Sequence, residues 1–576
     1  MSPIFLPVVV LFPIFGGVLI PVLPFKNRRQ MMIYIESIVL LNSLMALAVL
    51  LNRPEDEFVL FRFTSNLTLS FKLDGLGTVF AGLISALWPL ATLYAFEYME
   101  HEEHEKFFFM FYTITFGITM GIALAEDMVT MYCFYEMLTL VTVPLVLHTL
   151  TREAVLAGRT YLYYSLGGAA FAFIGVIFIL VYGTTPNFVA GGVLDLEKIG
   201  SRTNLLLLIY VFCFLGFSVK AAMFPFSGWL PKAGVAPTPV TALLHAVAVV
   251  KAGAFATMRI TYYSFGTEFL RGTWAQTVVM IPVIFTIVYG CSRALKETHL
   301  KRRLAWSTVS NLSYILFGVT LMSPLGLTGA LTHMVCHAVI KICSFFCAGA
   351  VITQSGNEYV YQLDGLGKKM PKVFVIFTIS GMALMGVPGL PGFISKWTLV
   401  KAAIDSTHPL AVVGVAALLI SALLTAIYML TISVRAFCSP ALAGWHPTLR
   451  AGYSPREASL NGRGDLPSPG GISALRAGYP PTEGRGRYLS NISADAQNVV
   501  KCVSADGQSG AECTPSDGQG EGKNASSGGH DVHGAVRDPG WMMLLPLAIF
   551  IAAMFVIGLH PQPLIDAFAK IASAMS

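Results

Sequence analysis

Runs of about 20 apolar residues recur along almost the whole chain, and this feature restricts the fold more than any other. A helix of that length spans the hydrocarbon core of a bilayer. Charged residues make up 12% of the chain, whereas soluble domains carry about 25%. Backbone polar groups in lipid must be paired within the protein, which leaves only helices and closed barrels. The sequence therefore predicts an all-α polytopic membrane protein.

The apolar runs predict about 14 transmembrane helices. Their approximate ranges are 3–23, 31–51, 76–95, 107–125, 128–149, 161–182, 205–226, 240–261, 274–293, 303–322, 327–352, 373–400, 409–436 and 541–560. The first run is too long for the core of a cleavable signal peptide, so we expect it to be a transmembrane helix.

The short loops carry the charges that set the orientation. Lysine and arginine gather in loops 26–29, 152–159, 293–303 and 368–372, which all fall on one side of the predicted membrane. The positive-inside rule places these loops in the cytoplasm and both termini outside. Loop 97–106 is acidic and should also be cytoplasmic, because acidic residues contribute little to the rule.

Residues 438–538 interrupt the apolar pattern. They are rich in Gly, Ser, Pro and Asp and have no sustained apolar period, which predicts disorder. We interpret them as a polar insert between the last two helices, with a cytoplasmic docking arm as the alternative. The predicted organisation is three N-terminal helices in 1–106, a first repeat in 107–262, a second repeat in 263–437, the insert, and a last helix in 539–576.

Four charged residues lie inside apolar runs, close to the middle of predicted helices: Glu136, Lys220, Lys251 and Lys396. A charge there costs roughly 2.5–3.5 kcal/mol on insertion scales, so it usually has a partner and a function. Burial and a nearby opposite charge act in opposite directions on ionisation, which makes such groups switchable. We therefore predict a proton path. The alternatives are a static ion pair at Glu136 and a Lys251 side chain that reaches the membrane surface.

The predicted helix 327–352 carries the most specific local pattern. His333, His337 and Lys341 are four residues apart and share one helix face over about 12 Å. Histidine exchanges protons near neutral pH, so we expect these residues to fill the gap between the central lysine and Lys396. A zinc site at the two histidines is the alternative, although no third ligand accompanies them locally.

Two further titratable residues are weaker candidates. His245 lies between Lys220 and Lys251 in the sequence and fits the same relay. Asp74 stands beside Gly75 at the start of a predicted helix, where it is either a helix cap or a functional group.

Prolines interrupt two of the predicted helices at matching places. Pro225 follows Lys220, and Pro388 and Pro391 precede Lys396. Proline removes a backbone hydrogen bond and exposes carbonyl groups. Broken helices at corresponding positions of two halves indicate inverted repeats with a site between them.

These residues and their surroundings resemble the antiporter-like proteins of respiratory complex I, membrane-bound hydrogenases and Mrp-type cation/proton antiporters. The matching stretches are 135–140, 216–231 (GFSVKAAMFPFSGWLP), 236–245, 250–253, 301–310, 333–341 and 388–396. The resemblance covers the predicted helices and leaves out the polar insert. It implies two inverted five-helix repeats, each with a half-channel, joined by a charged axis across the membrane centre.

The family carries a glutamate and three further charged residues that match Glu136, Lys220, Lys251 and Lys396. A lysine at the last position, and a chain that ends after the last predicted helix, make the D subunit of Mrp antiporters or its hydrogenase counterpart the nearest resemblance. His299 departs from the family, which often has aspartate there.

The resemblance implies a proton-translocating subunit in the inner (plasma) membrane of a prokaryote, with other membrane subunits of such a complex as partners. The driving force would be redox chemistry in partner subunits or exchange with Na⁺. We expect no metal or cofactor in this chain, because its nine cysteines have no metal-binding spacing and no haem, flavin, nucleotide or iron–sulfur motif is present.

Two other classes of function remain as alternatives. The chain is a structural subunit if its buried charges serve assembly only. A membrane enzyme acting on quinone or lipid is less favoured, because no paired carboxylates or nucleophile constellation is found. The chain would take part in an enzyme only as a subunit of a redox-driven pump.

Overall fold

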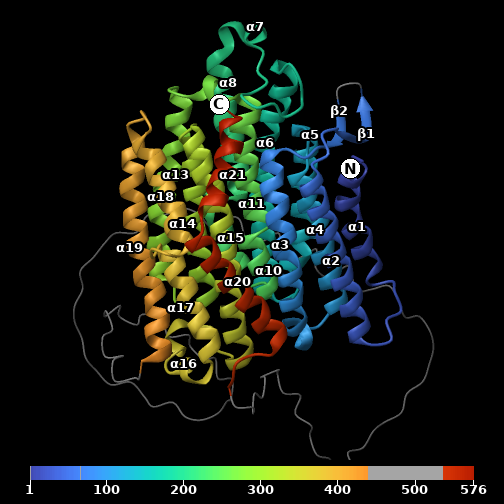
Figure 1. Cartoon of the computed structure of the whole chain (residues 1–576), viewed down its shortest axis with the longest axis vertical. Helices are drawn as coiled ribbons and strands as arrows, with labels where there is room; N and C mark the ends of the chain where they lie inside the picture. Colours follow the sequence, from blue (N-terminus) through green and yellow to red (C-terminus); the bar gives the residue numbers. More distant parts are fainter. Residues whose placement is uncertain (1, 65–66, 439–535, 576) are drawn as a thin grey trace, which may run out of the picture. The chain divides into compact units, whose positions relative to one another are not determined.

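Helices form most of the described chain, as the apolar runs predict. The computed structural model of the protein describes residues 2–64, 67–438 and 536–575. These residues belong to one unit, which Figure 1 shows as an array of upright helices with a small β-hairpin at one end. The insert predicted at 438–538 lies outside the described residues, apart from its first residue and its last three.

The α-helices follow one another in the order α1 (Phe5–Leu19), α2 (Arg28–Asn52), α3 (Gly75–Tyr98), α4 (Glu105–Ala123), α5 (Met128–Val146), α6 (Arg152–Tyr182), α7 (Leu196–Ile199), α8 (Thr203–Lys220), α9 (Trp229–Ala233), α10 (Thr238–Ala246), α11 (Val249–Arg259), α12 (Thr267–Leu270), α13 (Trp274–Lys296), α14 (Leu300–Thr320), α15 (Pro324–Ser355), α16 (Leu366–Lys369), α17 (Pro371–Met385), α18 (Pro391–Ile404), α19 (Leu410–Phe437), α20 (Trp541–Leu559) and α21 (Gln562–Ser573). Strands β1 (Phe58–Thr64) and β2 (Leu67–Phe71) form the antiparallel hairpin between α2 and α3.

Eleven helical stretches in the described residues are long and apolar enough to cross a membrane. Helices α1 and α17 are apolar but shorter, at 15 residues each. The all-α polytopic fold is thus confirmed, while the count of 14 spanning helices and the inverted repeats stay predictions.

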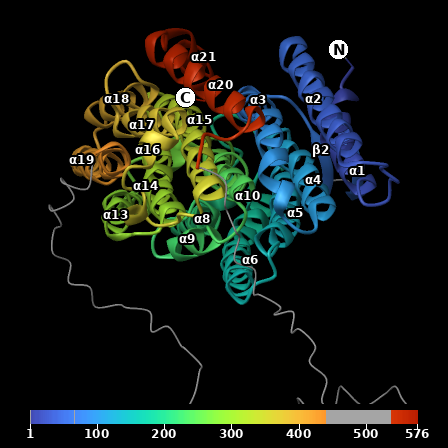
Figure 2. The same ribbon diagram turned by 90° about the horizontal axis from the view of Figure 1, so that it is seen from below.

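The most buried stretches form the centre of the array. The stretch that contains α10 and α11 is buried along its whole apolar window, and 89% of the window in α15 is buried. Figure 2 shows α10 and α15 in the middle, with α1 and α2 at one edge and α19 at the other. Charged groups on these central helices are therefore enclosed by other helices of the protein.

The structure differs from the sequence-based expectation in three elements. The helix expected at 240–261 is broken between α10 and α11, where Ala248 N–H bonds to the Leu243 carbonyl instead of continuing the α-helical ladder. The hairpin β1–β2 was not expected. Neither was the amphipathic helix α21, which follows the last predicted transmembrane helix and packs against α15.

The two proline breaks are present as expected. Helix α8 ends at Lys220, and a turn and short helices replace its continuation. Helix α17 ends at Met385, and α18 begins at Pro391 after five non-helical residues. Both breaks therefore lie beside a lysine.

Contacts at the end opposite the hairpin involve two of the acids of loop 97–106, Glu97 and Glu105. Glu105 forms an ion pair with Arg28 at 2.7 Å, which joins the start of α4 to the start of α2. Glu97 accepts hydrogen bonds from the backbone N–H groups of Gly540 at 2.5 Å and Met543 at 3.1 Å. A carboxylate at a helix N-terminus accepts hydrogen bonds from the free N–H groups and is attracted to the positive end of the helix dipole. Glu97 therefore fixes the start of α20 against α3.

We expect Glu97→Ala to lower the stability of the folded protein by about 1 kcal/mol, the usual cost of losing a helix cap. Thermal unfolding of the purified protein in detergent measures the change. The matched control is Glu100→Ala, which removes an exposed acid one turn away. Equal unfolding temperatures for the two variants would show that Glu97 does not hold α20.

Candidate functional site: a buried ion pathway

Glu136 and Lys220 form a loose ion pair between α5 and α8. The Lys220 Nζ lies 4.0 Å from Glu136 Oε1, and the two side chains are 1% and 23% exposed. No described residue hydrogen-bonds to that carboxylate oxygen. Lys220 instead donates to the Tyr135 carbonyl and lies 3.3 Å from the centre of the Tyr135 ring. Because the carboxylate holds the ammonium only weakly, the pair can open without breaking a strong hydrogen bond.

Helix α11 lies directly against the end of α8. Gly253 allows this approach, because a Cβ added there would lie 2.7 Å from the Ala221 nitrogen and 3.0 Å from the Lys220 Cβ. The helix that carries Lys251 therefore packs against the helix that carries Lys220. Residues two apart on a helix lie on different faces, so Gly253 marks a contact between the two helices and not between the two lysines.

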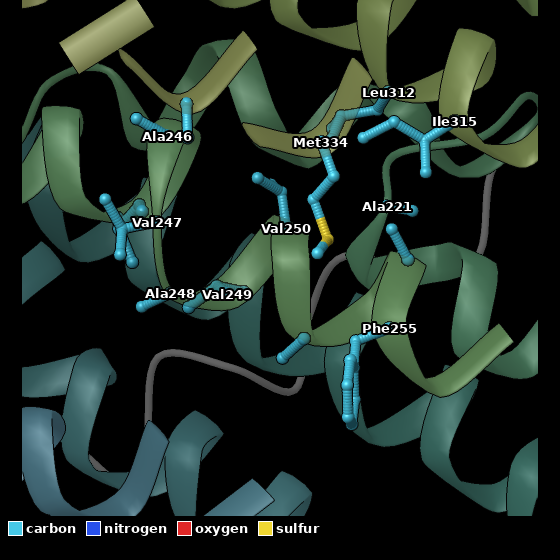
Figure 3. Packing of buried hydrophobic residues seen from close by; sticks show 14 of the residues in the cluster. Ala221, Ala246, Val247, Ala248, Val249, Val250, Phe255, Leu312, Ile315 and Met334 are labelled. Carbon is cyan, nitrogen blue, oxygen red and sulfur yellow. The ribbon is translucent and has the colours of Figure 1, made fainter. Parts of the chain in front are cut away.

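Buried apolar side chains gather at the break between α10 and α11, next to Lys251 in the sequence. Figure 3 shows Val247 and Val249 at the break, and Val250 beside Met334 of α15. Lys251 has no exposed surface, and its Nζ lies 2.8 Å from His337 Nδ1. The expected alternative, in which Lys251 reaches the membrane surface, is therefore wrong.

The two histidines of α15 continue from this contact. The rings of His337 and His333 lie 5.8 Å apart and are inclined by 29°. His333 Nδ1 lies 2.9 Å from the hydroxyl of Ser395 on α18, the residue before Lys396. No described residue hydrogen-bonds to Nε2 of either histidine. Buried polar atoms normally have a partner, so we expect water at these positions.

Lys396 uses the second helix break. Its Nζ donates to the carbonyls of Leu384 at 2.8 Å and Met385 at 2.9 Å, at the C-terminal end of α17. These carbonyls have no helical partner because α17 ends there, and the helix dipole favours a cation at this position. The Tyr314 ring of α14 lies 5.0 Å from the His333 ring and 5.5 Å from Lys396 Nζ. Tyr314 therefore bridges the histidines and the last lysine.

Lys341 does not lie between Lys251 and Lys396, which corrects the expectation from the sequence. Its Nζ donates to the Leu304 carbonyl at 3.0 Å and to the Ser307 hydroxyl, both on α14. His245, at the end of α10, packs against Phe345 with ring centres 4.9 Å apart and ring planes inclined by 41°, and no described residue hydrogen-bonds to its nitrogens. Lys341 and His245 therefore lie off the line of contacts that leads from Lys251 through His337 and His333 towards Lys396.

The structure contains no group of three or more potential metal ligands among the residues it describes. Within the described part of the chain, Nδ1 of His337 contacts the Lys251 amine and Nδ1 of His333 contacts the Ser395 hydroxyl, so neither of these nitrogens faces a ligand typical of zinc.

Sequence reasoning missed several charged residues, two of which lie within apolar runs: Arg259, which is buried, and Glu36, which is half-buried. Arg259 is 1% exposed and pairs with Asp74, which also caps α3 by accepting the Gly77 N–H at 2.8 Å. Glu36 lies within α2, and no described residue hydrogen-bonds to its Oε2. Both residues lie near the ends of apolar runs, where a charge is usually explained by proximity to the membrane surface. Asp74, which the sequence offered as either a helix cap or a functional group, is both the cap of α3 and the ion-pair partner of Arg259.

His299, where the sequence departs from the family pattern, also has a partner. Its Nε2 lies 3.5 Å from Glu358 Oε2, and the backbone of residues 298–300 pairs with residues 358–360. Hydrogen bonding to His299 lowers the pKa of the Glu358 carboxyl. This contact joins the start of α14 to the loop after α15.

Solved structures of respiratory and antiporter complexes share this fold. A chain of the archaeal membrane-bound sulfane sulfur reductase matches with a TM-score of 0.73 and 19% identity, covering 100% of this protein and 98% of that chain. A chain of the Mrp complex from Dietzia sp. matches with a TM-score of 0.72 and 21% identity, covering 99% and 97%.

Curated relatives cover most of the sequence. The NAD(P)H-quinone oxidoreductase chain 4 2 of Thermosynechococcus vestitus is 26% identical over 79% of this chain and 86% of its own length. The A/B subunit of a probable K⁺/H⁺ antiporter of Rhizobium meliloti is 32% identical over 59% of this chain and 34% of its own length. The model of the NADH:quinone oxidoreductase/Mrp antiporter transmembrane family matches residues 125–425, more than half of the chain. The protein belongs to the NADH:quinone oxidoreductase/Mrp antiporter family of membrane proteins.

Proposed function

We propose that this protein is a proton-translocating subunit of a multisubunit membrane complex. Protons would pass from the Glu136–Lys220 pair to Lys251, then through His337 and His333 to Lys396. Lys341 and His245 would form a side branch that gives the central lysine access to α14. The chain would have no catalytic centre of its own, and its membrane would be the inner membrane of a prokaryote with both termini outside.

The observation that carries this proposal is the line of contacts across the buried centre. Lys251, His337, His333 and Ser395 follow one another at 2.8 Å, 5.8 Å between ring centres, and 2.9 Å. Each histidine keeps one ring nitrogen free of described partners, which suits a group that must take up a proton on one side and release it on the other.

Charge coupling would drive the movement along this line. Protonating one buried group raises the cost of a positive charge on its neighbours, because the low dielectric of the interior screens them poorly. When Glu136 releases its hold on Lys220, the positive charge of Lys220 would act on Lys251 of the neighbouring helix α11. The positive charge would then move from one residue to the next towards Lys396.

The comparisons support two driving forces. The relatives include quinone oxidoreductase chains and a subunit of a probable K⁺/H⁺ antiporter, so the energy would come from redox chemistry in partner subunits or from exchange with a monovalent cation such as Na⁺. The lysine at 396 favours the D subunit of an Mrp-type complex, with other membrane subunits of that complex as partners. A structural role for the buried charges is the second candidate.

We expect Glu136→Gln and Lys220→Ala each to lower proton transport by at least about tenfold, which corresponds to ~1.4 kcal/mol of barrier. The reason is that each variant removes one member of the pair that starts the charge movement. Fluorescence of a pH-sensitive dye in membrane vesicles that contain the assembled complex measures transport. Subunit content, measured by immunoblot, gives the rate per complex.

The matched control is Glu153→Gln, which neutralises an exposed acid in the first turn of α6. Unchanged transport per complex in both test variants would refute the proposal. If the variants instead reduced only the amount of assembled complex, the structural role would be supported.

We expect His337→Gln to reduce transport by about 10²-fold or more, the lower end of what a positioned acid–base group contributes. The glutamine amide oxygen can still accept a hydrogen bond from Lys251, so the buried ammonium keeps a partner, but the amide does not exchange protons. Ser344→Ala is the control, because it removes another buried polar side chain from the same helix. Equal rates in the two variants would show that protons bypass His337.

A further inference from the structure

A second ion pair closes the end of α11 on the side of the β-hairpin. The guanidinium of Arg259, the last residue of α11, donates to both carboxylate oxygens of Asp74, with Nη2 to Oδ1 at 2.8 Å. Arg259 is 1% exposed and Asp74 is 26% exposed, so the pair extends from the interior to the surface. The pair joins α11 to the residue just before α3.

Aromatic rings enclose the guanidinium. The Arg259 Cζ lies 4.7 Å from the Phe188 and Tyr263 ring centres and 5.0 Å from that of Phe255. Ring faces attract cations, and they also keep bulk water away from this one. With water excluded, Asp74 is the group that balances the charge of Arg259.

A second acid–base pair lies next to the first. Glu126, between α4 and α5, lies 3.4 Å from Lys72, and their side chains are 9% and 40% exposed. Phe188 connects the two pairs, because its backbone N–H donates to the Glu126 carbonyl at 2.9 Å while its ring faces Arg259. We call Lys72, Asp74, Glu126 and Arg259 the hairpin-side cluster.

The hairpin-side cluster lies at the end of the helix that carries the central lysine. Arg259 is eight residues after Lys251, about 12 Å along the helix, and Phe255 stands between them on nearly the same face. A protonated Lys251 therefore lies on nearly the same helix face as a second cation, Arg259, whose charge Asp74 neutralises.

We infer that the hairpin-side cluster is the terminal station of the ion path, where protons pass between Lys251 and the water on the hairpin side. This inference rests on the proposed function. In the Arg259–Asp74 pair, the carboxylate neutralises the guanidinium and so keeps the electrostatic potential near Lys251 low enough for a proton to pass. Glu126 exchanges that proton with water beside the exposed Lys72. The ion that this cluster handles is a proton, so its function requires no additional bound ligand.

The acids of the hairpin-side cluster suit different tasks. Burial raises the pKa of Glu126 to about 7, and Lys72 opposes this rise. Burial also acts to raise the pKa of Asp74, but Arg259 outweighs it and the pKa of Asp74 is lowered. The charged groups that act on Glu126 are Lys72, Arg259 and Asp74. Near neutral pH, Asp74 therefore stays ionised as a counter-ion, whereas Glu126 exchanges its proton.

The first test neutralises the counter-ion. Asn caps helices as well as Asp, so Asp74→Asn keeps the start of α3 and leaves the buried Arg259 without an opposite charge. We expect transport per assembled complex to fall at least about tenfold. The double variant Asp74→Asn/Arg259→Gln should recover part of the rate, because it also removes the unpaired charge.

Asp127→Asn is the matched control. Asp127 caps α5 on the same side of the protein, as Asp74 caps α3, and bonds to Ser70 and Thr130 without contacting Arg259. Its rate should equal that of the unmodified protein. Normal transport in Asp74→Asn together with loss in Glu136→Gln would overturn this inference and leave the proposed function standing. Normal transport in both would refute the proposed function itself.

The second test measures transport against the pH on the hairpin side. We expect an inflection near pH 7 in the unmodified protein. Glu126→Gln should remove the inflection. Lys72→Gln should move it to higher pH, because the ammonium that favours the ionised carboxylate is lost. An identical profile in all three proteins would overturn the role of Glu126, and this readout holds even if Asp74→Asn fails to assemble.

Discussion

The contact between Lys251 and His337 is the interaction on which the rest of this architecture depends. An ammonium group without exposed surface is stable in a helical interior only when nearby groups replace its water. The loss of hydration costs on the order of several kcal/mol per ion, which one hydrogen bond at 2.8 Å offsets only in part. The surrounding structure supplies the remainder: α10, α11 and α15 occupy the most buried positions, and a chain of polar groups leads away from the lysine. A helix array with an apolar centre would be more stable, so the polar centre indicates a function.

Interrupted helices place the amines at either side of this centre. Within a continuous helix the carbonyl groups accept hydrogen bonds from the helix itself, whereas the last carbonyl groups of a helix that ends inside the protein have no such partner. Lys396 binds two such carbonyls at the end of α17, and Lys220 is the last residue of α8. The break after α17 thus provides a cation site that does not require a buried carboxylate. Lys220 instead binds the Tyr135 carbonyl within α5 and lies 4.0 Å from Glu136.

The main charged residues of the site could be predicted from the sequence because they interrupt long apolar runs. Glu136, Lys220, Lys251 and Lys396 stand out by their cost in a membrane, and the spacing of His333 and His337 places them on one helix face. Arg259 and Glu36 were missed because a charge near the end of an apolar run is normally attributed to the membrane surface. The break between α10 and α11 gave no signal, since the residues at that point, Ala246, Val247 and Ala248, include neither proline nor glycine.

The sequence by itself determined that this chain is a polytopic helical membrane protein with charged residues in its interior, because apolar length and charge cost are local properties. It also determined which two helices carry proline breaks. Only the tertiary structure decided which groups meet. Lys251 and His337 are separated by 86 positions in the sequence, and Asp74 and Arg259 by 185. Each pair meets through a packing of helices that no local sequence pattern predicts. The same packing turned Lys341 towards α14 and left Glu136 in loose contact with Lys220. Partner choice depends on distances between helices, and these are set by the whole core.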